Sequence, residues 1–169
     1  MTDTTNKQGE GEFAFVVNGV KVFVKGSNCV PLDAFHSRDA SRLDETFDMV
    51  VDLNCNMIRC WGGNVYESEA FFRRCDEAGV MVWQDFPLTS SGLENWPPED
   101  EASIAAMAEI ASSFIRRRQH HVSLLLWSGG NELQGDLEGR KNGVGKPCDA
   151  DHPMLRRLQE VAQALDPGR

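Results

Sequence analysis

Residues 57–63 read Met-Ile-Arg-Cys-Trp-Gly-Gly, a short apolar run that two glycines bring to an end. Its length and composition predict a buried β-strand. Ser68 can cap a helix that stops at Gly79, and residues 80–83, Val-Met-Val-Trp, form the next apolar run. The apolar face of that helix consists of Phe71, Phe72, Cys75 and Ala78. The chain here therefore alternates strand, helix and strand.

The same alternation continues on both sides of this segment. Apolar residues at helical spacing predict a helix over 41–53, another from Pro97-Pro98 to Arg118, and a last one from about Pro153 to 165. Residues 122–127 predict the fourth strand of the series. Uninterrupted apolar strands are typical of parallel sheets that are covered on both faces. An open doubly wound sheet remains an alternative, but the sequence has no GxGxxG motif or phosphate-binding loop, which favours a barrel.

A β-hairpin is predicted in front of this series. Residues 13–25 alternate around Asn18-Gly19, a dipeptide that tolerates positive φ at both central positions of a type I′ turn. We expect the second arm, near Val24, to be the first strand of the series and to end at residues 26–28. Residues 1–12 are polar and are predicted to be a disordered tail, which leaves residues 13–169 as the domain.

Composition excludes several classes of function. The chain has 169 residues and a net charge of −9, so we expect neither a nucleic-acid partner nor an anionic membrane partner. No apolar run approaches the roughly 20 residues of a membrane span, and residues 1–12 lack a signal-peptide core, which favours a cytoplasmic location. The five cysteines are Cys29, Cys55, Cys60, Cys75 and Cys148. Their odd number, without a CxxC pair, predicts reduced thiols in a core.

Polar and aromatic residues follow the predicted strands. In parallel α/β folds the active site lies at the C-terminal ends of the strands. Those ends carry Asn28 and Asp33, Arg59 to Gly63, Trp83 to Phe86, Trp127, and Asn131-Glu132. Tryptophan faces beside amides and carboxylates suit a sugar, because the rings stack on its C–H faces. The alternative is that Trp61, Trp83 and Trp127 only fill the interior.

Several of these segments together resemble a known family. They are residues 15–19 and 25–28, Pro31 with Asp33-Ala34-Phe35, residues 56–63 with Tyr66-Glu67, residues 75–79 with Trp83-Gln84-Asp85-Phe86, and Leu126-Trp127 with residues 129–132. The chain is similar over residues 13–169 to the catalytic domain of glycoside hydrolase family 2. Its closest branch holds the β-mannosidases, the endo-β-mannosidases and the exo-β-glucosaminidases. The resemblance implies a (β/α)₈ TIM barrel that hydrolyses β-linked sugars with retention, without a cofactor.

The resemblance also implies roles for individual residues. Glu132 would be the general acid/base, Asn131 would hold the sugar 2-hydroxyl, and Arg59 would orient the carboxylates. Trp61 would line the subsite for the non-reducing sugar, and Asp33 would bind a hydroxyl. Trp83 and Asp85 complete the expected substrate-binding set. Gly130 stands where many β-mannosidases carry a second asparagine, and residues 87–90 also depart from them, so the preferred sugar stays open.

The family's nucleophilic glutamate follows the seventh strand, whereas only four strand–helix units are predicted up to Arg169. We therefore expect the first half of a TIM barrel, which supplies the acid/base, needs a C-terminal half as partner, and is inactive in isolation. By itself this fragment is expected to form a homo-oligomer, most simply a two-fold dimer, that covers its open sheet edges or inner face. The alternative is a half-barrel that binds carbohydrate or self-associates without catalysis. Carboxylates that could pair locally with Glu132 are Asp33, Glu67, Asp85 and Glu94. For each of them we favour a structural or site-shaping role.

Charged residues cluster at the end of the helix that runs to Arg118. Residues 116–118 are three arginines, and His120 and His121 follow them. Positive side chains favour the C-terminal end of a helix dipole. No further ligand stands near the two histidines in the sequence, so we expect no zinc site and no other metal site.

Overall fold

The computed structural model describes residues 4–5, 11–12, 14–89, 95–134 and 147–169. Four parallel strands form its main sheet in the order β5-β6-β7-β8. They are β5 (Gly26–Cys29), β6 (Met57–Cys60), β7 (Met81–Asp85) and β8 (Leu124–Ser128). Neighbours in space are neighbours in sequence, which is the order of consecutive strands in a barrel. The predicted parallel α/β fold is confirmed.

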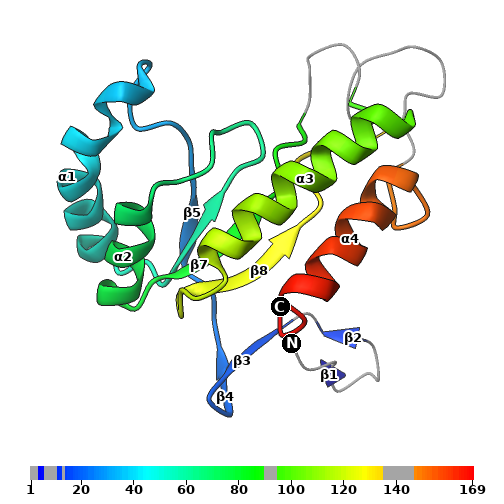
Figure 1. Ribbon diagram of the computed structural model, residues 1–169. Helices are drawn as coiled ribbons and strands as arrows, with labels where there is room; N and C mark the ends of the chain where they lie inside the picture. The colour runs from blue at the N-terminus through cyan, green and yellow to red at the C-terminus, as the bar shows by residue number, and fades with distance from the viewer. Residues whose placement is uncertain (1–3, 6–10, 13, 90–94, 135–146) are drawn as a thin grey trace.

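Helices follow the strands and lie along one side of the sheet (Figure 1). They are α1 (Asp39–Asp52), α2 (Glu69–Ala78), α3 (Glu101–Arg118) and α4 (Pro153–Leu165), with a 3₁₀ turn, η1 (His36–Arg38), before α1. The predicted caps of α2 are confirmed, because Ser68 Oγ accepts the Phe71 N–H and Gly79 is left-handed. The predicted start of α3 at Pro97-Pro98 is wrong: Asp100 caps this helix by accepting the Ser103 N–H. These three helix ends thus have a local chemical cause.

The predicted hairpin consists of β3 (Phe15–Val17) and β4 (Val20–Val22). Asn18 and Gly19 have φ of 51° and 79°, as a type I′ turn requires. The expectation that its second arm is the first parallel strand is wrong. The amide of Asn56 accepts the Lys25 N–H and donates to the Phe23 carbonyl, and a new strand, β5, then pairs with β6.

Within the segment expected to be a disordered tail, β1 (Thr4–Thr5) pairs with β2 (Gly11–Glu12). The predicted fourth strand begins two residues later than expected: β8 starts at Leu124, and Val122 is 83% exposed.

Among the described residues, no helix is both long and apolar enough to cross a membrane.

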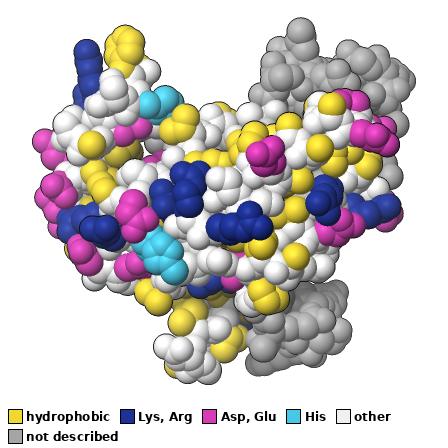
Figure 2. Space-filling model, in the orientation of Figure 1, with side chains coloured by type: hydrophobic (Ala, Val, Ile, Leu, Met, Phe, Trp, Pro, Cys, Tyr) yellow, Lys and Arg dark blue, Asp and Glu magenta, His cyan; other side chains and the backbone are white. Residues whose placement is uncertain are grey.

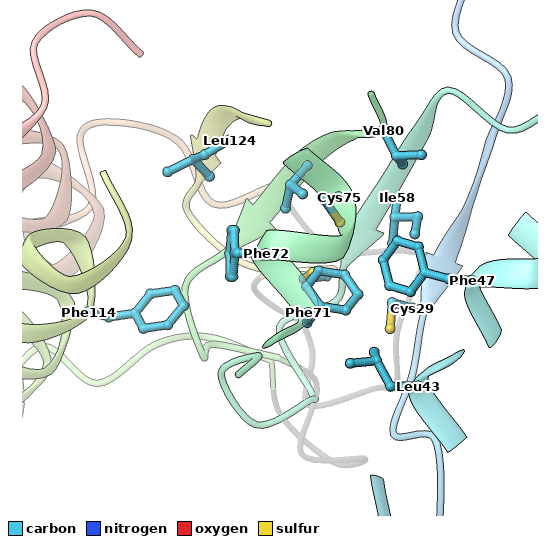
Figure 3. Close-up of a cluster of buried hydrophobic side chains, with 12 residues drawn as sticks. Cys29, Leu43, Phe47, Ile58, Phe71, Phe72, Cys75, Val80, Phe114 and Leu124 are labelled. Atoms are coloured by element: carbon cyan, nitrogen blue, oxygen red, sulfur yellow. The ribbon is translucent and has the colours of Figure 1, made fainter. Parts of the chain in front are cut away.

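Two apolar clusters attach the helices to the sheet. The first joins α1 and α2 to the outer face, where Phe47, Phe71 and Phe72 are almost fully buried (Figure 3). Cys29, Cys60 and Cys75 belong to the same cluster, as predicted for core thiols, whereas Cys55 and Cys148 are only partly buried and the prediction is wrong for them. The second cluster packs α3 on α4 around residues such as Ile115 and Leu158. Both clusters lie on the helix side, so the strand ends stay available for polar groups.

Candidate active site

Arg59 on β6 joins the ends of all four parallel strands. Its Nη2 donates to Asp85 Oδ2 at 2.6 Å and to Asn131 Oδ1 at 2.8 Å, and its Nε donates to Asp85 Oδ1 at 3.3 Å. Nη1 donates to Asn28 Oδ1 on β5 at 3.3 Å. Parallel strands bring these residues together although 72 positions separate Arg59 from Asn131 in the sequence. We call Asn28, Arg59, Asp85 and Asn131 the strand-end cluster.

Asp85 is the anchor of the strand-end cluster. Its side chain is fully buried, while that of Arg59 keeps 26% exposure. The carboxylate also accepts the Gly62 N–H at 3.1 Å and the Trp83 Nε1–H at 3.0 Å. A buried carboxylate with this many donors stays in one orientation, and it holds the guanidinium with it. Asp85 is therefore a hydrogen-bond acceptor that holds Arg59, and its part in substrate binding stays a prediction.

Glu132 lies beside the strand-end cluster on a bent loop after β8. Its φ is 51° and that of Gly130 is 145°, so the loop passes twice through the left-handed half of backbone space. Such a conformation persists only where neighbours hold it. Leu88 accepts the Asn131 N–H at 2.8 Å, and Asn95 Nδ2 donates to the Glu132 carbonyl at 3.0 Å. The Glu132 side chain is exposed and is available to a ligand.

Three residues contribute to the candidate site although the predicted substrate-binding set did not include them: Asn28, Leu88 and Asn95. Asn28 had been placed at a strand end, so its position was readable from the strand pattern. Leu88 and Asn95 act through a backbone carbonyl and a buried amide in the segment after β7. No motif in the sequence marks them, because their role depends on the path of that segment beside β8.

The structure does not bring Asp33 and Trp127 into this group. Asp33 accepts Arg42 Nε at 2.8 Å and the Phe35 N–H at 2.9 Å, contacts that arrange the entry to α1. Trp127 turns toward the helices: its Nε1 donates to Asp166 at 3.0 Å and its ring stacks on Phe86. Trp127 therefore packs between the sheet and the helices, away from the polar groups at the strand ends.

Of the three tryptophans expected at strand ends, the other two, Trp61 and Trp83, remain near them. The Trp83 ring lies 5.9 Å from the Arg59 guanidinium carbon. Trp61 is half-buried and lies over Gly63, where a Cβ would overlap the indole. Glycine at 63 is therefore required for this indole position.

Two further carboxylates were candidates for pairing locally with Glu132, namely Glu67 and Glu94. Glu67 is largely buried, accepts Asn64 Nδ2 at 2.8 Å and lies 3.6 Å from the Cys29 thiol. Burial raises the pKa of Glu67 despite these hydrogen bonds. Its contacts fit a structural role. Glu94 lies outside the described residues.

A hollow of about 820 Å³ lies between the hairpin and the inner face of β5, β6 and β7. Arg59, Trp83 and Asn28 line it near the strand ends, and Phe15, Phe23 and Met57 are among its apolar walls. The sheet is thus apolar and concave on the side away from the helices. Polar groups concentrate where the strands end.

Comparison with known proteins agrees with this geometry. Mouse β-mannosidase is 41% identical over 121 residues, which is 71% of this chain and 13% of the relative. β-Mannosidase B of Aspergillus fumigatus is 37% identical and covers 96% of the chain, which spans 20% of that relative. The crystal structure of β-D-mannosidase from Dictyoglomus thermophilum superposes with a TM-score of 0.78 at 30% identity, over 99% of this chain and 20% of that one.

A β-glucuronidase structure from Bacteroides uniformis, at 23% identity and a TM-score of 0.70, shares the fold. The sheet and hairpin are those of a partial TIM barrel. Residues 11–169 match the glycosyl hydrolases family 2, TIM barrel domain, and the chain therefore belongs to that family.

Proposed function

We propose that this chain is the acid/base-bearing part of a retaining glycoside hydrolase that acts on β-mannosides or similar β-linked sugars. The observation that carries the proposal is the Arg59 guanidinium, which joins Asp85 and Asn131 directly beside Glu132. A carbohydrate is the substrate, and the β-mannosidase relatives favour mannose as its sugar.

Glu132 is the general acid/base in this proposal. It protonates the glycosidic oxygen as the aglycone leaves, and it then removes a proton from the water that hydrolyses the glycosyl intermediate. The anchored backbone around Glu132 restricts where its carboxyl group can reach. Exposure of the side chain suits a group that must exchange protons with both a leaving group and water.

Asn131 and Arg59 position the sugar. The Asn131 Oδ1 is occupied by Arg59 Nη2, so the amide nitrogen is the group that it presents to a ligand. That nitrogen can donate to a sugar 2-hydroxyl. Arg59, in turn, is fixed by Asp85 and supplies positive charge beside a nucleophilic carboxylate. The two side chains thus orient partners at the reacting carbon without a metal or cofactor.

The nucleophile is proposed to come from residues outside this sequence. Retention requires two carboxyl groups about 5–5.5 Å apart. Asp85, Asp33 and Glu67 are each engaged by other groups in the structure. The chain spans 13% to 20% of the length of the relatives described above, which is consistent with a second half of the barrel elsewhere.

The test joins residues 11–169 to the C-terminal part of a β-mannosidase TIM barrel and measures hydrolysis of an aryl β-mannoside. We expect turnover that falls by about 10²–10⁴ in Glu132→Gln. Glu109→Gln, on the exposed face of α3, should leave it unchanged. The 169-residue chain by itself should show only trace hydrolysis. Ordinary turnover by that chain, lost in Glu132→Gln, would instead reveal a second carboxylate within it.

Self-association without catalysis is the second candidate. The apolar hollow and the exposure of Phe23 (82%) and Val20 (65%) on the hairpin favour it. A homo-oligomer that covers this side would remove apolar surface from water at about 25 cal/mol per Å². Sedimentation equilibrium at micromolar concentration tests it. A clean monomer of 18.8 kDa would contradict self-association.

A further inference from the structure

Three possible metal ligands converge on the helix-covered side of the sheet. Glu69 lies in the first turn of α2, and His120 and His121 follow α3. One ligand atom from each lies within 4.8 Å of the other two. Figure 2 shows a histidine side chain at the surface beside acidic and basic side chains near α2 and the end of α3. The third ligand could not be recognised in the sequence, because about 50 residues separate Glu69 from the histidines.

The spacing of these atoms comes close to that in the coordination shell of zinc. His121 Nε2 lies 3.3 Å from Glu69 Oε2, and His120 Nε2 lies 3.8 Å from Glu69 Oε1. Zinc–ligand bonds of about 2.0–2.2 Å in a tetrahedron place ligand atoms about 3.3–3.5 Å apart. His121 and Glu69 already meet this spacing. His120 is 62% exposed at its side chain and can close the small remaining gap by rotation.

A supporting carboxylate fixes the orientation of His121. Its Nδ1 lies 2.6 Å from Asp76 Oδ2, and the Asp76 carboxylate also accepts the Ser123 N–H. Histidines that bind metals usually donate their other N–H to a carboxylate in this way. The Nε2 lone pair of the buried His121 then faces a Glu69 oxygen, which carries lone pairs too. A metal ion between these two atoms would use both of them as ligands.

Two arginines compete for the same carboxylate. Arg118 Nη1 lies 2.9 Å from Glu69 Oε2, and Arg73 Nε lies 3.6 Å from Glu69 Oε1. A carboxylate has about four lone-pair sites, so it can keep a guanidinium while it binds an ion. The positive charge of the two guanidinium groups lowers the metal affinity of this site below that of a closed structural zinc site. The exposed His120 leaves the fourth position open to water.

We propose that Glu69, His120 and His121 form a binding site for Zn²⁺ or a similar divalent transition metal, supported by Asp76. Two imidazoles and one carboxylate suit such ions better than Mg²⁺ or Ca²⁺, which prefer oxygen ligands. The ion joins α2 to the turn between α3 and β8. It has no part in the reaction proposed for Glu132.

The experiment titrates ZnCl₂ into the 169-residue chain by calorimetry, with circular dichroism to check folding. We expect one ion per chain and at least tenfold weaker binding in His120→Ala, whose exposed side chain is not needed for the fold. Asp76→Asn should weaken binding by about 10–100-fold. His36→Ala removes another exposed histidine and should leave binding unchanged.

Ring proton signals of His120 and His121 should shift in NMR spectra on addition of Zn²⁺, whereas those of His36 should not. Absence of one-to-one binding would overturn the proposal. Binding that His120→Ala leaves unchanged would also overturn it, because the ion would then lie on the thiols or elsewhere. Neither result bears on the test of Glu132.

Discussion

Replacement of Asp85 by alanine should destabilise the fold more than replacement of any exposed carboxylate. The change removes the acceptor for Arg59, for the Gly62 N–H and for the Trp83 Nε1–H. Loss of one partner from a buried ion pair costs about 3–5 kcal/mol. Because Arg59 keeps 26% exposure, water can solvate part of its guanidinium, and we expect about 3 kcal/mol, at the lower end. That is a large fraction of the roughly 5–15 kcal/mol of an ordinary domain.

Urea unfolding monitored by tryptophan fluorescence measures this change in the free energy of unfolding. Asp85→Asn keeps the shape but loses the charge, and it should cost nearly as much. Asp44→Ala is the control, because this carboxylate is 87% exposed and lies 3.5 Å from Arg74, and it should cost far less. A cost under about 1 kcal/mol for both Asp85 variants would refute the view that this carboxylate anchors the strand-end cluster.

Two further predictions concern the loop after β8 and a buried carboxyl group. Gly130→Ala should lower the free energy of unfolding by more than about 1 kcal/mol, because φ is +145° and the new Cβ would lie 2.6 Å from the Leu88 carbonyl oxygen. Gly168→Ala, where a Cβ meets nothing within 4 Å, should change it by less than about 0.5 kcal/mol in the same urea unfolding experiment. Burial raises the pKa of Glu67 above its usual 4.5, so its contribution to stability is full below pH 4.5 and is lost as pH rises through the folded-state pKa. Glu67→Gln should remove this loss and flatten stability against pH above 4.5, and an unchanged slope would show that Glu67 titrates as it does in the unfolded chain.

Local patterns predicted most of the elements. The Asn18-Gly19 turn, the Ser68 cap and the Gly79 stop each depend on a few neighbouring residues, and the structure shows all three. One error occurred where a boundary depended on a distant group. The hairpin arm gives way to β5 because of Asn56, which lies about 30 residues further along the chain. Such a contact leaves no periodic signal near Lys25.

The candidate site was predictable in part for a related reason. Parallel strands bring their C-terminal ends to one edge, so Arg59, Asp85 and Asn131 could be grouped before their contacts were known. The direction of a side chain was less predictable. Trp127 and Asp33 stand close to strand ends in the sequence, yet they bind Asp166 and Arg42 instead. The position of a strand end fixes where the backbone lies, whereas contacts with the neighbouring helices determine the direction of the side chain.

By itself, the sequence determined that this protein alternates strands and helices, carries a hairpin at its start, and places Glu132 after the last strand. These properties follow from short-range periodicity and from turn and cap chemistry, which act within a few residues. Only the tertiary structure decided that Arg59 holds Asp85 and Asn131 together and that Glu69 lies against His120 and His121. Those contacts cross tens of residues, and they form only because the packing of the sheet and helices fixes both partners in space.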